Sequence, residues 1–360
     1  MNPIDTDVLR DLLSRSDYRG LAAFCSESHP ATAADALAEL SPEEALNVFR
    51  HLEDQHRADI FSHMDLDLQV EFISLFERWE VARLLTDMPP DDRADLFKNL
   101  PEDRWEEILP AMAHAEREDI RRLMAYEEGT VGAVMTSDYA ALSPDLTASE
   151  AIERLRAVAP DRETIYSAYV VDSNRRLLGY VSLKDLIVAR RDRLVSDLMH
   201  TEIISARVGD DQEDAARKIQ KYDLIALPVV DDTDSLVGIV THDDALDIIT
   251  QEHTEDMEKF MAIAGSHEAS AYMKTGTFRH FRNRAGWVII LAVLGMVSGL
   301  IMQRAENLLL QFTMLVAFIP MLAAAGGNAG SQTASLIIRA LALKEVDGRR
   351  LPGILFKELR

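Results

Sequence analysis

The chain has 360 residues, enough for several domains, and a formal net charge of −23. The charge is uneven: from Thr277 onward ten Lys or Arg outnumber four Asp or Glu, for a net of +6, which leaves −29 on residues 1–276. Such an acidic body argues against nucleic acid as a partner, since phosphate binding needs a basic face, and leaves cation binding or simple solubility as explanations. Cys25 is the single cysteine, which excludes a disulfide framework and a thiolate metal cluster.

Residues 5–126 are predicted to form a stack of short helices, because large apolar residues recur at every twelfth position. Each unit fits one helix that begins at Pro or an acidic residue, and one such helix cannot bury its apolar stripe alone. We expect a small right-wound helical solenoid, a class of domain that usually serves interaction or regulation. The recurring positions are Leu40, Leu52, Met64, Phe76, Met88, Leu100, Met112 and Met124, with a second set at Val48, Ile60, Phe72, Leu84, Leu96, Ile108 and Ile120.

Acidic residues gather in one of these units. Asp91 and Asp95 are four residues apart and so share a helix face, with Asp92 between them and Asp59 in an earlier unit. Spacing leaves two interpretations open, a cation site and a solvated helix start.

A duplicated module follows between Met135 and Ile249. Both copies read Val-Val-Asp and then Leu-x-Gly-x-Val-Ser/Thr-x-x-Asp, and the second motif ends at Asp185 in one copy and at Asp244 in the other. Each copy is predicted to form two strands joined by a turn with Gly, followed by a helix. Another helix precedes each copy, around residues 148–158 and 212–222.

This fingerprint resembles a pair of CBS domains, small α/β modules that associate in tandem. Such pairs often bind a ligand, frequently an adenine nucleotide, and they indicate regulation without defining the regulated activity. The resemblance implies a nucleotide-binding role for Asp185, at the position where many CBS modules hold a ribose; Thr241 and Asp244 are its equivalents in the second copy. Helix capping is the competing interpretation.

An acidic helix is predicted after the second copy, from His242 onward. Its carboxylates are dense enough to repel one another unless solvent, Lys or Arg, or a divalent cation offsets them. Mg²⁺ and Ca²⁺ take oxygen ligands, so a cation is one explanation and a solvated connecting helix is the other. The carboxylates are Asp243, Asp244, Asp247, Glu252, Glu255, Asp256 and Glu258.

Two uncharged runs are predicted to cross a membrane, at about residues 285–303 and 307–338. Their flanks are basic, which places the flanks and the N-terminal body in the cytoplasm. The second run contains polar and flexible positions that a helix facing only lipid would not need. These positions are Pro320, Gly326, Gly327, Asn328, Gly330 and Gln332. These groups suggest a path through the membrane, which Asn328 and backbone carbonyls freed around the glycines would line.

The order of these parts resembles the MgtE family of magnesium channels and transporters over essentially the whole chain. The resemblance implies a multidomain protein that combines an all-α helical-repeat domain, an α/β CBS pair, a connecting plug helix and an α-helical transmembrane region. Their expected bounds are 1–128 for the helical repeat, 129–194 and 195–250 for the two CBS domains, 251–276 for the plug helix and 277–360 for the transmembrane region. Ala329 and Ser331 depart from the Thr and Asn that are commoner in the family.

The resemblance also implies a mechanism and its residues. The family forms homodimers in the lipid of the inner membrane, and cytoplasmic Mg²⁺ locks the pore shut by binding between the N-terminal domain, the CBS pair and the plug helix. The implied Mg²⁺-sensing carboxylates are Asp59, Asp91, Asp95, Asp211, Glu213, Asp223, Asp244, Asp247, Glu252, Glu255 and Asp256. The implied cofactors are Mg²⁺ and, in the CBS cleft, ATP.

One departure concerns the pore. The family's pore has five membrane helices per subunit, whereas only two predicted spans precede Arg360, so we expect the chain to sense Mg²⁺ without conducting it. The alternatives are a transporter of another divalent cation controlled by adenine nucleotide and a non-conducting, membrane-anchored regulatory scaffold. We find no enzyme motif, such as a Ser/His/Asp order, a phosphate loop with Lys or a His cluster with metal spacing.

Overall fold

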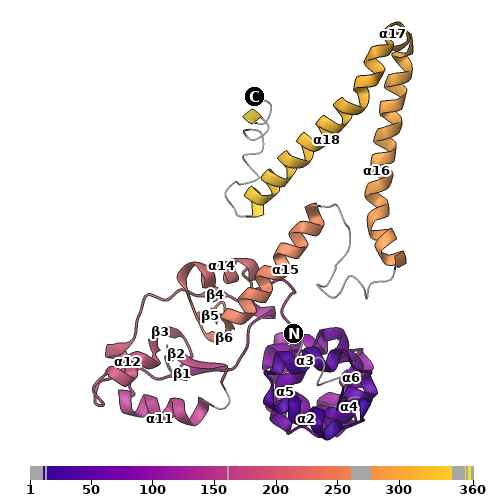
Figure 1. Ribbon diagram of the computed structural model, residues 1–360. Coiled ribbons are helices and arrows are strands. Elements are labelled where there is room, and N and C mark those ends of the chain that lie inside the picture. Colours follow the sequence, from indigo (N-terminus) through magenta and orange to yellow (C-terminus); the bar gives the residue numbers. More distant parts are fainter. Residues whose placement is uncertain are drawn as a thin grey trace. The chain divides into compact units, whose positions relative to one another are not determined.

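The computed structural model describes residues 11–12, 14–159, 162–260, 277–342, 353 and 356–357 (Figure 1). The chain divides into two compact units, Met1–Ile249 and Thr250–Arg360. The first unit holds the helical repeat and two small sheets, and the second holds long helices.

The helical repeat is confirmed. Each helix packs on the second helix after it, so that α2 contacts α4 and α8 contacts α10. The helices are α2 (Tyr18–Glu27), α3 (Pro30–Ala38), α4 (Pro42–Phe49), α5 (Asp54–Ser62), α6 (Leu66–Leu75), α7 (Arg78–Thr86), α8 (Pro90–Asn99), α9 (Glu102–Ile108) with the short η1 (Leu109–Ala111), and α10 (His114–Met124).

The twelve-residue period builds the core of this domain. All seven positions of the second predicted set are buried, and so are the first-set positions from Leu52 to Met112. Phe49 lies at the centre, with its ring 5.5 Å from that of Phe72 and 6.3 Å from that of Phe61. Local chemistry starts the helices, as at α4, where Ser41 and Glu44 form a capping box.

The duplicated module forms two three-stranded sheets of equal topology, in which a parallel pair is extended by an antiparallel strand. The predicted helices ahead of the two-stranded motif in each copy are confirmed as α11 and α14. The first copy contains β1 (Tyr139–Leu142), α11 (Ala148–Val158), β2 (Thr164–Val171), β3 (Leu177–Ser182), α12 (Leu183–Val188) and α13 (Val195–Leu198). The second contains β4 (Ala206–Arg207), α14 (Gln212–Tyr222), β5 (Ala226–Val230), β6 (Leu236–Thr241) and α15 (His242–Phe260).

The two copies exchange their leading segments. The segment before β1 includes the short helix η2 (Val131–Ala133), and there Thr136 pairs with Ile239 of β6. In the same way His200, in the leading segment of the second copy, pairs with Tyr180 of β3. This exchange explains the glycine of the repeated motif, because a Cβ on Gly238 would lie 2.8 Å from the carbonyl oxygen of Thr136.

The acidic helix predicted from His242 onward is continuous with the last helix of the second CBS copy, so no helix boundary falls at residue 251. α15 starts at His242, directly after β6, and runs to Phe260. No Pro or Gly interrupts the chain between these residues, so the helix of the second CBS copy continues into the acidic stretch. Residues 261–276 of the expected plug helix lie outside the described residues.

The second unit contains α16 (Thr277–Arg304), α17 (Glu306–Gln311) and α18 (Thr313–Ala342), with the short α17 joining the two long helices (Figure 1). Among the described residues, one helix is long and apolar enough to cross a membrane, at Ala285–Arg304 of α16, with a mean hydropathy of 2.3. The second predicted span, about 307–338, is not one helix, because α17 ends at Gln311 and α18 begins at Thr313. That α18 crosses a membrane stays a prediction.

Candidate functional site

Four carboxylates from three parts of the first unit form one acidic cluster. Asp91 and Asp92 lie in the first turn of α8, Asp244 lies in the first turn of α15, and Glu163 lies in the turn before β2. The negative charge of Asp244 raises the pKa of each of the other three. Asp91, Asp92, Glu163 and Asp244 are called the acidic cluster below.

Burial makes repulsion inside the acidic cluster costly. Burial, and then the Asp244 carboxylate, raise the pKa of Asp92 to about 7. Burial, followed by Asp92, Asp244 and Glu163, also raises the pKa of Asp91 well above its usual range. The Oδ1 atom of Asp91 is buried and accepts no hydrogen bond within the described part of the chain. A buried, unpaired carboxylate oxygen is unfavourable, so the cluster favours the arrival of a proton or a cation.

Two members of the acidic cluster are positioned by their own backbone surroundings. Asp244 caps α15, where its Oδ2 accepts hydrogen bonds from the hydroxyl and the backbone N–H of Thr241, the latter at 3.3 Å. The backbone N–H of Glu163 donates to the carbonyl of Asp138 at 3.0 Å. Burial first, and then Asp244 and Asp243, raise the pKa of Glu163. Hydrogen bonds therefore fix the side chain of Asp244 and the backbone of Glu163 within the acidic cluster.

The predicted site included Asp91 and Asp244 but missed Glu163 and left out Asp92. Asp92 was noted between Asp91 and Asp95 in the sequence but was not included among the Mg²⁺-sensing residues. Glu163 carries no local signal, since its neighbours in the sequence belong to the turn between α11 and β2. Folding alone brings it beside the start of α8.

Two predicted carboxylates of the helical repeat lie apart from the acidic cluster's centre. Asp59 is exposed on α5, where its charge adds to burial and to Asp54 in raising the pKa of Asp87. Asp95 lies one turn beyond the cluster on α8 and pairs with Lys98 at 2.9 Å. Burial raises the pKa of Asp95 and Lys98 lowers it. Asp95 thus already has a cationic partner.

The predicted carboxylates of the second CBS copy lie at opposite ends of α14. Asp211 is the N-cap, accepting from the backbone N–H of Glu213 at 2.8 Å, and Glu213 pairs with Arg217. Asp223 follows the last turn in the left-handed region, with φ of 51°. A helix of this length separates its ends by about 16 Å, so one ion does not bridge them.

The predicted carboxylates of α15 follow one another along the helix. Asp247 contributes to the raised pKa of Asp244, after burial and Asp243, and so lies at the edge of the acidic cluster. Glu252 is half-buried and Glu255 is exposed, both in the second unit. The side chain of Asp256 lies outside the described residues.

The described residues contain no group of three or more His, Cys, Asp or Glu side chains placed to hold a metal ion directly. The acidic cluster is thus a concentration of charge without a closed coordination shell. Such an arrangement suits a cation that keeps much of its water, as Mg²⁺ does.

Asp185, the predicted nucleotide residue, lies in the first turn of α12. Its Oδ2 accepts a hydrogen bond of 2.6 Å from Ser182 and lies 3.2 Å from Nε2 of His200. The Ser182 hydroxyl is the main cause that lowers the pKa of Asp185. His200 in turn stacks on Tyr180, with ring centroids 5.0 Å apart. Asp185 thus makes the helix-capping interaction with Ser182, and the stacked rings of His200 and Tyr180 lie beside it.

The predicted pore residues all lie within α18. Pro320 is inside the helix, and the helix continues through Gly326, Gly327 and Gly330 without a break. The expected release of backbone carbonyls around the glycines is therefore absent from this helix. The side-chain amides of Asn328 and Gln332 are exposed on this helix.

Comparison with known families assigns a class to this combination. Residues 28–129 match the MgtE intracellular N domain, residues 131–192 and 195–251 each match the CBS domain, and residues 319–360 match a family described as divalent cation transporter. A helical repeat and a CBS pair, followed by a transporter segment, define a divalent cation transporter with regulatory domains.

Individual relatives narrow this class. The chain is 36% identical over 357 residues to the magnesium transporter MgtE of Thermus thermophilus. The matched residues cover 98% of this chain and 78% of that protein. It is 32% identical to the MgtE of Bacillus subtilis, which covers 89% of this chain and 73% of that protein. The chain belongs to the MgtE family of magnesium transporters. Both relatives are named as transporters and not as enzymes.

Solved structures agree with this assignment for the first unit. The soluble part of a magnesium transporter matches 69% of this chain and 98% of its own, with 31% identity and a TM-score of 0.64. The cytosolic domain of the Mg²⁺ channel MgtE, in complex with ATP, matches 68% of this chain and 99% of its own, with 34% identity and a TM-score of 0.64.

Proposed function

We propose that this chain is a subunit of a magnesium channel or transporter that cytoplasmic Mg²⁺ closes. The observation that carries the proposal is the acidic cluster, because Asp91 and Asp92 come from the helical repeat, Glu163 from the first CBS copy and Asp244 from the second. Three parts of one regulatory unit thus meet through like charges.

Charge repulsion supplies the switch. Without a cation, the carboxylates of the acidic cluster oppose the contact between the helical repeat and the CBS pair. A divalent cation between them offsets this repulsion, and it binds the closed contact more tightly than the separated domains. A ligand shifts an equilibrium by this difference in affinity. Mg²⁺ therefore favours the docked state, and a fall in Mg²⁺ releases it.

Weak binding suits the task. Mg²⁺ keeps several water molecules when it binds proteins, so carboxylates that are near one another but form no closed shell hold it through water. The exposed Asp247 and Glu255 and the half-buried Glu252 add negative charge along α15. Several weak contacts of this kind place the threshold near cellular Mg²⁺ concentrations.

The membrane part follows the same proposal. We assign α16 and α18 to transmembrane helices of an inner-membrane homodimer, with the first unit in the cytoplasm, on the strength of the hydropathy of α16 and the basic residues flanking both helices. Asn328 and Gln332 then offer amide oxygens to a hydrated cation along α18. The chain spans 78% of the length of the Thermus relative. That a complete conducting path forms in the whole protein is therefore proposed.

A nucleotide site belongs to the same regulatory unit. Asp185 and His200 are adjacent, and the His200 ring is stacked on Tyr180, which provides a carboxylate for ribose hydroxyls beside flat rings. The related cytosolic domain that was solved with ATP supports an adenine nucleotide as its ligand.

Limited proteolysis of the full chain in detergent tests the sensor. Millimolar Mg²⁺ is expected to slow cleavage of the wild type, because it stabilises the docked contact. Asp244→Asn keeps the helix cap but removes a charge from the acidic cluster, so its cleavage should depend less on Mg²⁺. Asp232→Asn removes an exposed charge of the same CBS copy and serves as the control. Equal cleavage of the wild type with and without Mg²⁺ would refute the proposal.

A further inference from the structure

The first CBS copy has a second polar site, on the outer edge of its sheet. A cavity of about 280 Å³ lies beside β1, and three arginines line it: Arg154 of α11, Arg162 after α11, and Arg175 of the β2–β3 turn. Ser137 and Tyr139 line it as well. These residues are called the arginine pocket. Three cationic side chains around one cavity stand out in the acidic part of the chain, which carries −29.

Two of the arginines are held in place and the third is available. Arg162 pairs with Asp138 at 3.0 Å, and Arg175 donates to the Tyr139 hydroxyl and to the carbonyl of Leu236. Arg154 forms no ion pair within the described part of the chain. Three arginines and no Asp or Glu line the pocket, and Asp138 pairs with Arg162, so the pocket itself is cationic. Four acidic residues line the cavity that adjoins it: Asp145, Glu150, Glu153 and Asp172. Preorganised guanidinium groups of this kind are suited to phosphate oxygens, which they bind through paired hydrogen bonds.

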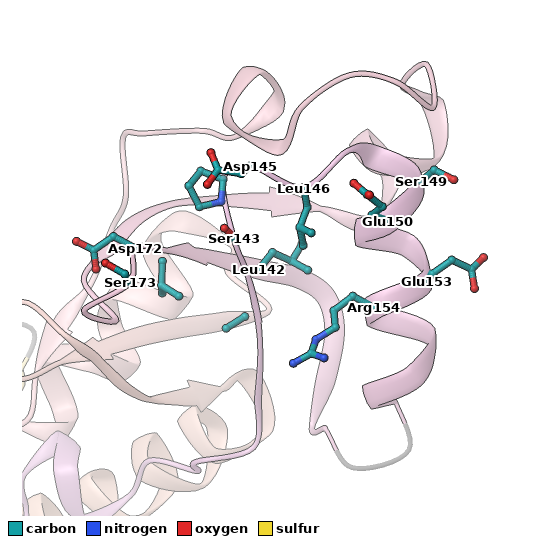
Figure 2. Close-up of a pocket in the computed structure, with 13 residues that line it drawn as sticks. Leu142, Ser143, Asp145, Leu146, Ser149, Glu150, Glu153, Arg154, Asp172 and Ser173 are labelled. Atoms are coloured by element: carbon teal, nitrogen blue, oxygen red, sulfur yellow. The ribbon is translucent and has the colours of Figure 1, made fainter.

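A larger cavity of about 920 Å³ adjoins the arginine pocket and indicates the rest of the ligand. The two cavities share Ala141, Arg154 and Val171. Figure 2 shows Arg154 extending from α11 toward the strands, with Leu142 and Leu146 above it and with Asp172 and Ser173 on the opposite rim. The wall of this cavity combines apolar side chains with hydroxyl and carboxylate groups, which suits the non-phosphate part of a ligand that carries hydroxyl groups.

We propose that the arginine pocket binds the phosphate group of a small phosphorylated sugar, with the sugar in the adjoining cavity. The arginines supply charge and directed donors for the phosphate. The wall near Asp172 supplies acceptors for sugar hydroxyls, and Leu142 and Leu146 cover its carbon face.

This site is separate from the one at Asp185. Ser182, which precedes Asp185, pairs with Ser167 at one end of the β2–β3 ladder, whereas Val171 of both cavities pairs with Leu177 at the other end. Asp185 and His200 line neither cavity. The arginine pocket instead adjoins the junction of the two CBS copies. Tyr139 and Arg175, from the first copy, both donate a hydrogen bond to the carbonyl of Leu236, the first residue of β6 in the second copy.

Calorimetric titration of the full chain in detergent tests the proposal, with ribose 5-phosphate and inorganic phosphate as probes in Mg²⁺-free buffer. Ribose 5-phosphate should bind saturably and more tightly than inorganic phosphate, since it also fills the adjoining cavity. Arg154→Gln should weaken its binding by about ten-fold or more, the usual effect of losing a charged hydrogen bond. Arg154 is exposed, so this variant should fold normally.

Two matched variants separate the explanations. Arg156 lies on the same helix as Arg154, pairs with Glu153 and lines neither cavity. The Arg156→Gln variant should therefore bind ribose 5-phosphate like the wild type. Asp185→Asn tests whether ribose 5-phosphate binds instead at the nucleotide site proposed above. The proposal is overturned if ribose 5-phosphate shows no saturable binding, if Arg154→Gln and Arg156→Gln bind equally, or if only Asp185→Asn loses binding.

Discussion

Asp92→Asn tests the physical basis of the acidic cluster most directly. Asn has almost the same shape as Asp and no charge, so the substitution imitates the protonated carboxyl. Asp92 is partly buried near Asp244 and Glu163, and its pKa is raised from 3.8 to about 7. The native state therefore holds this proton between about pH 4 and pH 7, where the unfolded chain releases it.

The sign and the size of the effect follow from this pKa. The free energy of unfolding falls as the pH rises from 3.8 to about 7. Above this range the charged Asp92 carboxylate destabilises the native state to its full extent. A shift of about three units, at 1.36 kcal/mol per unit, sets an upper bound of about 4 kcal/mol. Separation of the domains relieves part of the repulsion, so we expect Asp92→Asn to stabilise the protein by about 1–4 kcal/mol at pH 8.

Thermal unfolding in the presence of a chelator measures this gain. At pH 8 the midpoint of Asp92→Asn should exceed that of the wild type, by about 2–4 °C for each kcal/mol. At pH 5 the gain should be smaller, because the wild-type carboxyl is then largely protonated. Asp232→Asn, at an exposed position, should show no such pH dependence. A gain for Asp92→Asn that is equal at pH 5 and pH 8, or no gain at all, would contradict the electrostatic account.

Three further predictions concern the fold, and thermal or urea unfolding measures each. Phe49→Ala should destabilise the helical repeat by about 3–5 kcal/mol, since Phe49 is 0% exposed among other Phe rings; a loss under 1 kcal/mol would contradict this role. Gly238→Ala should cost about 1–3 kcal/mol, because its Cβ would meet the Thr136 carbonyl, whereas Gly209→Ala, with no atom within 4 Å, should be tolerated. Thr147→Ala should cost about 1 kcal/mol by removing the capping box of α11, and Thr147→Ser should restore most of it.

Local patterns predicted the secondary structure well. The twelve-residue period identified buried positions such as Phe72 and Leu96, because every unit packs in the same way on its neighbours. The predicted helices 148–158 and 212–222 match α11 and α14 to the residue, since Thr147 and Asp211 cap them. The acidic helix was predicted from His242 onward, where α15 begins, but no local signal separates its CBS part from its connecting part.

Contacts between distant segments were beyond these patterns. The segment around Thr136 begins the first CBS copy in the sequence but pairs with β6 of the second copy. The motif glycine at position 238 was visible, yet its reason, the close approach of the Thr136 carbonyl, was not. Asp211, Glu213 and Asp223 were all included in the predicted Mg²⁺-sensing set, and only the structure shows that Asp223 lies at the end of α14 opposite to the other two.

The sequence by itself determined the helical repeat, the CBS pair, the family and the uneven charge, because periodicity, capping residues and composition act over short distances along the chain. Only the tertiary structure decided which carboxylates meet. Asp92, Glu163 and Asp244 are far apart in the sequence, and the packing of α8, the turn before β2 and the start of α15 brings their charges together. Charge repulsion depends on distance in space and on burial, and both are properties of the folded unit.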